Sequence, residues 1–460
     1  MSQASRREFL RRAGAFSLLH TAGPLGLQLA GIGAAAAASQ PADYRAIVCL
    51  FMYGANDGHN TLVPRETSAY ARYAAARSVI ALPREQLLPL AGLPALGLHP
   101  ELEPLQHLFD KGSAAILANV GPLVQPIKDA ATFKSTNIAR PPKLFSHNDQ
   151  QAIWQAFSPE GAKIGWGGRI ADLIASHNGK QLFTAISAAG NAVFLASDKT
   201  IQYQITNNGA IGFNRANAGN IFGSAKGAEV LRQQIAMAQG DLFAQEYGTV
   251  VNRSIEAHGL LSAALAKLPA TDPRIDLPTD LTQDKLAQQL RIVARMIGVR
   301  DDENIQQRRQ VFFVSLNGFD THDNQLAKQG ELLRSVAQSI AYFQQSMEEL
   351  GVADKVTLFT ASDFGRALLS NGDGSDHGWG NHHFIVGGVV KGGKLYGQFP
   401  DVALNTSTDV GNGRLLPTTA VDQYAATVAR WMGVSETDLP LVLPNIGNFA
   451  SNNLGFMKKV

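Results

Sequence analysis

Two apolar runs, each followed at once by a polar cluster, constrain the fold of this chain most. Residues 311–316 lead into Gly318-Phe-Asp-Thr-His-Asp323, and residues 356–359 lead into Thr360-Ala-Ser-Asp-Phe-Gly-Arg366. Residues 325–350, between the two, have apolar side chains at helical spacing. This order predicts a βαβ unit whose two strands are parallel neighbours. Both polar clusters would then lie beyond the carboxyl ends of the strands, where open α/β sheets bind ligands.

The remaining patterns extend this unit to an α/β fold, a three-layer sandwich with a mostly parallel central sheet. Residues 190–305 are predicted to form a helical insertion or cap, or alternatively a loosely packed side of the same domain. Further strands are expected at 46–53, 114–120 and 181–188. Helices are expected near 100–111, after Pro417, and in a segment that residues 143–149 lead into and that runs through Trp154. Residues 384–396 are predicted to form a β-hairpin that turns at Lys391-Gly-Gly.

The N-terminus has the pattern of a twin-arginine (Tat) export signal. It begins Ser5-Arg-Arg-Glu-Phe-Leu-Arg11, continues as a weakly apolar stretch and ends in small residues, so we expect cleavage after Ala38. An N-terminal membrane anchor is the alternative, which His20, Gly26 and Gln28 disfavour. The predicted domains are therefore a signal, residues 1–38, and one α/β domain, residues 39–460. No later stretch is long and apolar enough to span a bilayer, so we expect a periplasmic or secreted protein that the Tat machinery exports.

Charge and cysteine content argue against a nucleic-acid-binding protein and against an internally disulfide-bonded one. The chain has net charge +2, and residues 1–38 contain four arginines and one glutamate, so the mature part is 2 − 3 = −1. A nearly neutral chain without a basic run has no nucleic-acid footprint. The single cysteine, Cys49, cannot form an internal disulfide.

Acidic residues and histidines that follow strands are the candidate metal ligands. Asp57 lies in a glycine-flanked turn, where an Asx turn is the alternative, and Asp363 has an N-cap as its alternative. Asp320 and His322 are two apart in an extended segment and could face one ion, although a capping role for Asp320 is equally compatible. Three histidines within seven residues, beside Asp376, favour metal or anion binding over loop hydrogen bonding: His377, His382 and His383.

The candidate catalytic residues are Ser146, His147 and Arg366. Asp149 follows Ser146 by three residues, so a capping box is the favoured alternative to a nucleophile at a helix N-terminus. His147 is adjacent to Ser146 and therefore poorly placed as its base, so a reactive Ser146 would need a metal. Arg366 could bind phosphate or sulfate, or could be a structural partner of Asp363.

Together these motifs resemble the exported domain-of-unknown-function family 1501, in the alkaline phosphatase-like superfamily that includes sulfatases. The resemblance covers nearly the whole mature chain, through motifs such as Phe51-Met-Tyr-Gly-Ala-Asn-Asp-Gly58, Gly318-Phe-Asp-Thr-His322, Ser362-Asp-Phe-Gly-Arg366 and Asp376-His-Gly378. It implies Asp57 and Asp363 on one metal, Asp320, His322 and His377 on another, and Ser146 as nucleophile. Phe364 stands where the superfamily usually has His or Asn, and Asp320-Thr-His322 is a shortened spacing. These departures leave open a single ion, or none.

The resemblance implies a metal-dependent hydrolase or transferase for phosphate or sulfate esters, acting on an ester or polymer of the cell envelope. One or two divalent ions, drawn from Zn, Mg, Mn or Ca, could clamp the attacking and leaving oxygens. The complete candidate ligand set is Asp57, Asp320, His322, Asp363, His377 and His382. The alternative is a non-catalytic descendant of the fold that binds an envelope ligand or assists assembly.

Overall fold

The computed structural model describes residues 43–211 and 242–458, together with a few isolated positions between 224 and 233. The predicted signal, residues 1–38, lies outside the described residues, so it stays a prediction. Residues from Asp43 onward form one compact unit. Within the described ranges, no helix combines the length and the apolar character that crossing a membrane requires.

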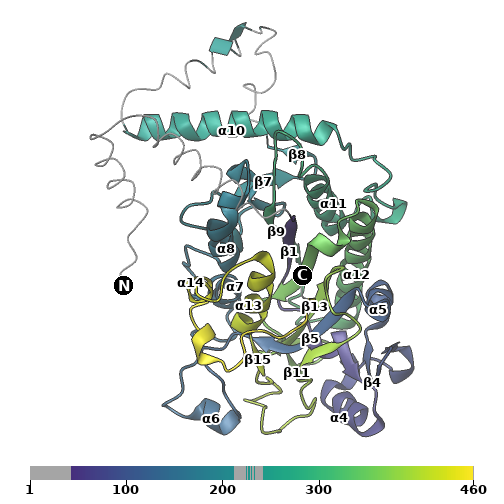
Figure 1. The fold of residues 1–460 in the computed structure, drawn as a ribbon. Helices are drawn as coiled ribbons and strands as arrows, with labels where there is room; N and C mark the ends of the chain where they lie inside the picture. Colours follow the sequence, from purple (N-terminus) through teal and green to yellow (C-terminus); the bar gives the residue numbers. More distant parts are fainter. Residues whose placement is uncertain are drawn as a thin grey trace. The chain divides into compact units, whose positions relative to one another are not determined.

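The centre of the fold is a ten-stranded sheet, as far as the chain is described (Figure 1). Its order is β14-β5-β13-β10-β1-β9-β6-β7-β8, in which β8 is Gly209–Ala210, and β15 (Thr419–Ala420) lies beside β5. Five neighbouring strands are parallel: β10 (Val356–Ser362), β1 (Arg45–Tyr53), β9 (Arg309–Asn317), β6 (Ala185–Ser187) and β7 (Tyr203–Thr206). Strand β13 (Asn381–Val386) runs antiparallel to both β10 and β5 (Ala114–Gly121). The mostly parallel sheet of the predicted fold class is confirmed.

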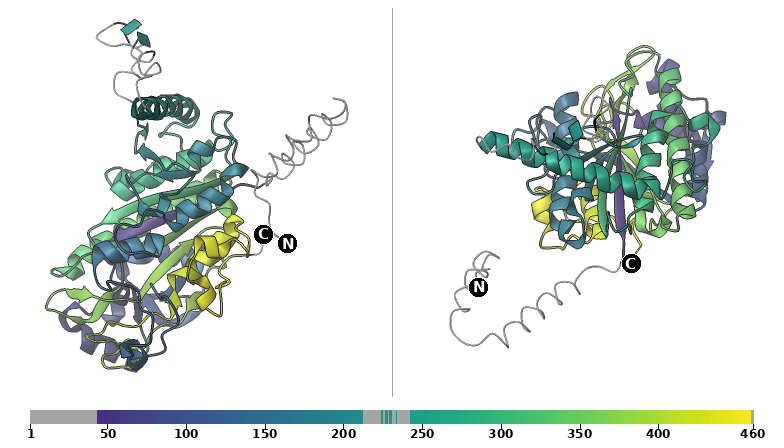
Figure 2. Two further views of the ribbon diagram at one scale, coloured as in Figure 1. Left: turned by 90° about the vertical axis from the view of Figure 1, so that its left-hand side faces the viewer. Right: turned by 90° about the horizontal axis from the view of Figure 1, so that it is seen from above.

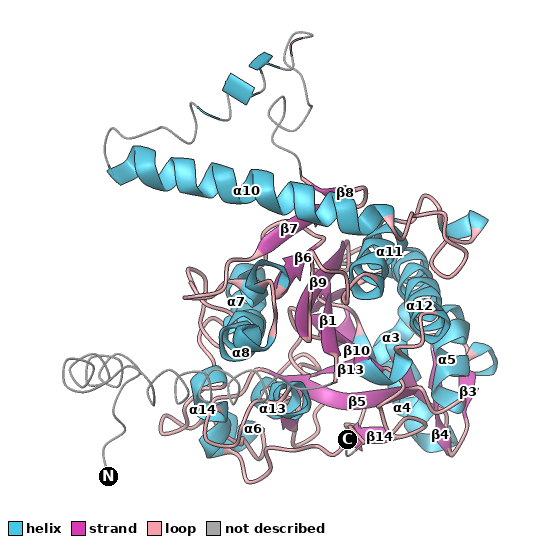
Figure 3. Ribbon diagram, turned by 45° about the horizontal axis from the view of Figure 1, so that its top comes forward, coloured by secondary structure: helices cyan, strands magenta, loops and turns pink. Residues whose placement is uncertain are grey.

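Alternating side chains of β1 divide the apolar core into two layers. Val48 and Leu50 pack into a core cluster with residues of α5, α11 and α12, whereas Cys49 and Phe51 pack into a second cluster with residues of α8 and α13. Because successive side chains of a strand point to opposite faces, a strand buried on both faces is apolar throughout. Helices α11 and α12 therefore cover one face of the sheet and α7 and α8 the other (Figure 3). The three-layer sandwich is confirmed.

The helices lie close to their predicted positions. The spacing over 325–350 forms α12 (Gln325–Glu349), and the patterns near Trp154 and after Pro417 form α7 and α13. The remaining helices have these bounds: α3 (Gly58–Thr61), α4 (Thr67–Arg77), α5 (Glu103–Asp110), α6 (Ala130–Lys134), α7 (His147–Ala156), α8 (Trp166–Ile174), α10 (Leu242–Ala266), α11 (Lys285–Gly298), α13 (Val421–Met432) and α14 (Leu439–Val442).

Two predicted strand pairings are wrong. Strands β9 and β10 are parallel, but β1 lies between them and pairs with both along its length (Figure 2). The apolar runs before and after residues 391–393 do not form a hairpin, because β13 and β14 (Leu395–Gly397) lie on either side of β5. In both cases a strand from elsewhere in the sequence occupies the space between two strands that are close in sequence.

The segment predicted as an insertion or cap contributes to the core of the unit. Strand β7 extends the main sheet beside β6, and α11 packs against β9 and α12. Smaller sheets flank the main one: β2 (Leu62–Pro64), β4 (Leu93–Leu98) and β3 (Leu88–Leu90) form one, and β11 (Arg366–Ser370) and β12 (Ser375–His377) form the other. The β11–β12 pair matters most for the site, because it places Arg366 opposite His377.

Candidate functional site

The polar clusters meet because three parallel strands end together. Tyr53 of β1 is in register with Asn317 of β9, and Met52 of β1 with Ser362 of β10. The chain that leaves each strand is then held close to its neighbours. Gly54 has φ of +107°, and a Cβ atom on it would approach the backbone nitrogen of Asp320 to 2.4 Å. Only glycine fits this position, so the turn after β1 admits the Asp320 loop.

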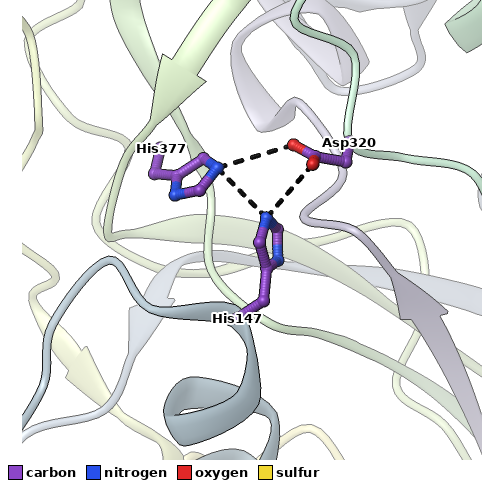
Figure 4. Close-up of side chains that lie close together, drawn as sticks. All are labelled: His147, Asp320 and His377. Atoms are coloured by element: carbon purple, nitrogen blue, oxygen red, sulfur yellow. Dashed lines mark hydrogen bonds and ion pairs between the residues drawn. The ribbon is translucent and has the colours of Figure 1, made fainter.

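His147, Asp320 and His377 form the centre of the candidate site (Figure 4). The Nε2 atoms of the two histidines are 3.1 Å apart. Asp320 approaches both, with Oδ2 at 3.4 Å from Nε2 of His147 and Oδ1 at 3.5 Å from Nε2 of His377. Three side chains from α7, from the loop after β9 and from β12 thus direct one ligand atom each to a common point.

The opposite side of each imidazole is fixed by a hydrogen bond. Nδ1 of His147 donates to Oδ2 of Asp363 at 2.6 Å, and Nδ1 of His377 donates to the carbonyl oxygen of Phe145 at 2.7 Å. These bonds place a proton on each Nδ1 and leave each Nε2 with its lone pair toward the common point. Two lone pairs cannot face each other at this distance without a positive charge, which either a proton or a metal ion supplies.

Asp363 is the orienting carboxylate of the site. It is fully buried, and besides His147 it accepts hydrogen bonds from Nε2 of Gln151, at 2.7 Å, and from the backbone nitrogen of Gly54, at 3.2 Å. Carboxylates that hold the far nitrogen of a ligating histidine are common behind metal sites, because they fix the tautomer and the ring orientation. In this arrangement Asp363 acts through His147.

His322 and Arg366 complete the surroundings of Asp320. Nε2 of His322 lies 3.0 Å from Asp320 Oδ1 and 3.0 Å from Nε2 of His377. Nη1 of Arg366 donates to the same Oδ1 at 2.6 Å, and its other nitrogens contact Ser375. The predicted partnership of Arg366 with Asp363 is therefore wrong: its partner is Asp320. Ser375 of β12 contacts the Arg366 guanidinium and donates its backbone N–H to the carbonyl oxygen of Thr321 at 3.2 Å, so the β11–β12 pair lies against the Asp320 loop.

The pKa values follow from these contacts. Burial disfavours the charged form of His147, but the hydrogen bond and charge of Asp363 and the charge of Asp320 outweigh it and raise the pKa of His147. Burial, with the nearby charges of His147 and Arg366, lowers the pKa of His377. Burial also opposes ionisation of Asp320, but the Arg366 guanidinium and the neighbouring histidines outweigh it and lower the pKa of that carboxyl. At neutral pH the site thus holds an ionised Asp320 and a neutral His377.

The donor set fits one divalent ion. Two imidazole nitrogens with fixed tautomers and one carboxylate oxygen, all within 4.8 Å of one another, match the three protein ligands of a metal site that keeps an open position. His322 lies beside this set and could join it. The ring of Phe364 packs against both His147 and His377, at centroid distances of 4.8 and 4.9 Å, so an apolar group covers one side.

Two predicted ligands are not brought to this cluster. Asp57 is fully buried, caps α3 through the backbone nitrogen of His59, and forms an ion pair with the equally buried Arg77. His382 is buried, accepts a hydrogen bond from the backbone nitrogen of Asn119 at 3.1 Å and stacks on Phe399. Burial lowers the pKa of His382 to about 3, so it is neutral. Both side chains already have protein partners, which explains their absence from the cluster.

Ser146 lies at the N-cap of α7, but the predicted capping box does not form. Its hydroxyl donates to Oδ2 of Asp149 at 2.8 Å and accepts no backbone hydrogen bond of the helix. Its two chain neighbours both contact the cluster, Phe145 through its carbonyl oxygen and His147 through its ring. The hydroxyl is therefore held by a carboxylate beside the site.

Sequence reasoning missed three residues of this environment. Gln151 is one turn after His147 on α7, so the helical spacing could have indicated it. Phe145 has φ of +72°, a conformation that is unusual outside glycine and occurs at functional sites, but no sequence pattern announces it. Arg414, whose Nε donates to the carbonyl oxygen of His377 at 3.0 Å, lies 37 residues away in a loop.

Several solved structures resemble this chain distantly. They include Ps i-CgsB in complex with k-i-k-neocarrahexaose, 10% identical over 88% of this chain and 77% of that one, with a TM-score of 0.36. The PsFucS1 sulfatase from Pseudoalteromonas sp. is 9% identical over 84% and 72%, with a TM-score of 0.33. The lipoteichoic acid synthase LtaP from Listeria monocytogenes is 9% identical over 88% and 76%, with a TM-score of 0.34. Likeness at this level carries no conclusion about reaction or ligand.

One family model matches part of this chain. No curated protein matches the chain. Residues 232–439 match a family described as "Protein of unknown function (DUF1501)". This range contains Asp320, Asp363 and His377, but it begins after β1 and α7. Over residues 232–439, this match confirms the resemblance to domain-of-unknown-function family 1501 that the sequence motifs predicted.

Proposed function

We propose that this protein is an exported, metal-dependent hydrolase or transferase that acts on phosphate or sulfate esters. The convergence of Nε2 of His147, Nε2 of His377 and the Asp320 carboxylate carries the proposal. Hydrogen bonds from the opposite ring nitrogens orient both imidazoles toward this point. The nitrogen-rich donor set favours Zn²⁺ over Mg²⁺, Mn²⁺ or Ca²⁺, which prefer oxygen ligands.

A single ion suits this site better than two. Phe364 occupies the side of the cluster where another ligand would have to stand, and the charge of Asp57 is neutralised by Arg77. When bound, such an ion supplies a Lewis acid to a phosphoryl or sulfuryl oxygen. Asp363 and the Phe145 carbonyl would keep the two imidazoles in position, and Arg366 would hold Asp320.

Ser146 is the proposed nucleophile, with Asp149 as its proton acceptor. Oγ of Ser146 already donates to Asp149, so the proton has a short path as Oγ bonds to phosphorus or sulfur. The ester oxygen leaves and takes a proton from solvent. Water then releases the group in a hydrolase, and an acceptor hydroxyl does so in a transferase.

The test is metal analysis of the purified, exported protein, followed by assays of a panel of phosphate and sulfate esters. One equivalent of metal with hydrolysis of at least one ester is the expected result. His147→Ala and His377→Ala should each lower the metal content. Ser146→Ala should abolish turnover and leave the metal content unchanged. Substoichiometric metal together with no hydrolysis across the panel would end the enzyme proposal.

A non-catalytic envelope-binding or assembly protein is the second candidate. One observation favours it: Arg366 is fully buried and directs its nitrogens to Asp320, Ser375 and Gly54 of the protein itself. Four of its five N–H groups are therefore already used within the protein, and the guanidinium is buried away from a phosphate or sulfate group. A protein that binds an envelope polymer but turns over no ester would support this candidate.

Export rests on the N-terminal sequence alone. Replacing Arg6 and Arg7 by lysine should keep the protein in the cytoplasm if the Tat machinery exports it. Fractionation of cells that express the natural and the substituted chain measures this. Unchanged periplasmic or secreted protein would remove the export part of the proposal.

A further inference from the structure

A second arginine, Arg414, lies next to the candidate site and has different contacts from Arg366. Nε of Arg414 donates to the carbonyl oxygen of His377 at 3.0 Å, and its guanidinium carbon lies 4.4 Å from the centroid of the Phe145 ring. Both contacts are made with residues that form the site: His377 supplies a ligand atom, and Phe145 orients His377. The Arg414 guanidinium is thus in direct contact with two residues of the site, His377 and Phe145.

Arg414 also has donors to spare. Across the described parts of the chain, its Nη1 and Nη2 take part in no hydrogen bond and no ion pair, and the residue is half-buried. A guanidinium presents five N–H groups in a planar fork, and only one of them is used here. Stacking on Phe145 fixes the plane of the fork, which lowers the entropy lost when an anion binds.

The charge balance at the site points to an anionic ligand. Arg366 is paired with Asp320, and His147 with Asp363, so neither is free to meet a further negative charge. Arg414 is a cation without a carboxylate partner among the described residues, and it adjoins a cluster that fits a divalent ion. Phosphate and sulfate esters have two or three oxygens that accept such a fork.

We propose that Arg414 is the anion-binding residue of the site and binds the phosphate or sulfate group of the substrate through Nη1 and Nη2. This inference rests on the proposed function and deepens it, because it assigns the anion-binding role that sequence analysis gave to Arg366. Phe145 links the two parts of the site: its carbonyl orients His377 and its ring supports Arg414.

The experiment measures binding of inorganic phosphate and of sulfate to the full chain by calorimetry, with and without added Zn²⁺. Arg414→Ala should weaken anion binding about 10- to 100-fold, because hydrogen bonds between charged groups are lost. Arg414→Lys should recover part of the affinity, since it keeps the charge but loses the fork. Metal content should be the same in all three proteins.

Arg140→Ala is the matched control, because Arg140 also lies over a phenylalanine ring, that of Phe133, at 5.5 Å but is not in contact with the cluster. It should leave anion affinity unchanged. Equal affinity in Arg414→Ala and in the natural chain would overturn the inference, as would the absence of any anion binding. If metal is absent but anion binding still depends on Arg414, the inference holds and the metal-dependent function fails.

Discussion

Two carboxylates at the same rim of the sheet have opposite surroundings. Asp57, after β1, is fully buried and pairs with Arg77, Gln325 and the backbone of α3. Asp320, after β9, is 44% exposed and faces three imidazoles as well as Arg366. The first carboxylate is completely satisfied by the protein, whereas the second shares its charge with groups that can exchange a proton or bind an ion. Position at a strand end is therefore insufficient to make a carboxylate a ligand.

The imidazoles near each carboxylate differ in the same way. Burial and the charge of Arg77 lower the pKa of His59 to about 3, and burial lowers the pKa of His99 to about 4. In the cluster the pKa of His147 is instead raised, since its two carboxylates outweigh burial. Imidazoles around Asp57 are thus structural and neutral, whereas His147 can carry charge. The following experiments would break or sharpen this contrast.

The largest effect is expected from pH. Native His59 and His99 stay neutral down to pH values far below the ordinary pKa of histidine, so the unfolded chain binds their protons first. Their contribution to stability is complete above about pH 6.5 and is lost as pH falls toward 4, by about 1.4 kcal/mol per pH unit for each. For these two histidines together this is about 5 kcal/mol between pH 6 and pH 4. Burial also lowers the pKa values of His382 and His383 to about 3, so they add to the loss in the same direction. Urea unfolding of metal-free protein at several pH values measures it.

A single substitution checks the assignment to these imidazoles. His99→Asn keeps a side-chain acceptor for the backbone nitrogen of Glu101 and should reduce the slope of stability against pH by one histidine's share. His107→Asn, at a side chain that is 71% exposed, should leave the slope unchanged. An unaltered slope in His99→Asn would show that its burial does not set its protonation.

The next largest effect concerns the buried ion pair. Asp57→Asn or Arg77→Met removes one partner and leaves the other charge buried, which should cost about 3–5 kcal/mol of unfolding free energy. Asp401→Asn breaks the exposed pair with Arg72, whose side chains are 48% and 54% exposed, and should cost under about 1 kcal/mol. Chemical denaturation of the metal-free proteins measures both. Asp57→Asn protein that folds should keep its full metal content. Loss of metal in this variant would show that Asp57, like Asp320, contributes to metal binding.

Removal of a proposed ligand should act mainly on metal binding. Asp320→Asn and His377→Ala each delete one of three converging ligand atoms, so we expect metal affinity to fall more than about 100-fold. His377→Ala should change the stability of the metal-free protein little, because His377 is half-buried. Asp320→Asn also removes the charge that pairs with the buried Arg366 guanidinium, so it should lower the unfolding free energy of the metal-free protein as well. Competition with a chromogenic chelator measures the affinity. Full metal retention in both variants would exclude the proposed ligand set.

The smallest effect on metal affinity is expected from Asp363, the carboxylate that orients the ligand His147. Asp363→Asn keeps the shape of the side chain that orients His147 but removes its charge, so metal affinity should fall about 10- to 100-fold. Asp172→Asn, at a carboxylate that accepts backbone hydrogen bonds from residues 198–200, is the control and should leave affinity unchanged. A decrease in Asp363→Asn as large as that in His377→Ala would make Asp363 a ligand itself.

The sequence alone determined the local elements and the identity of the polar clusters. Apolar periodicity is a property of neighbouring residues, so β1, β5, α7 and α12 could be located from it. The polar segments after β9 and β10 were correctly expected to meet at one rim, because parallel strands carry their carboxyl ends to the same edge.

Only the tertiary structure decided which partner each charged group has. Strand β1 separates β9 from β10, β5 separates β13 from β14, and Arg366 pairs with Asp320, while Asp57 is neutralised by Arg77. His147 and Asp363 are 216 residues apart, yet their contact fixes the tautomer on which the proposed metal site depends. Sequence spacing limits contacts only within a turn or a strand, whereas pairings across the sheet depend on the order in which the strands pack.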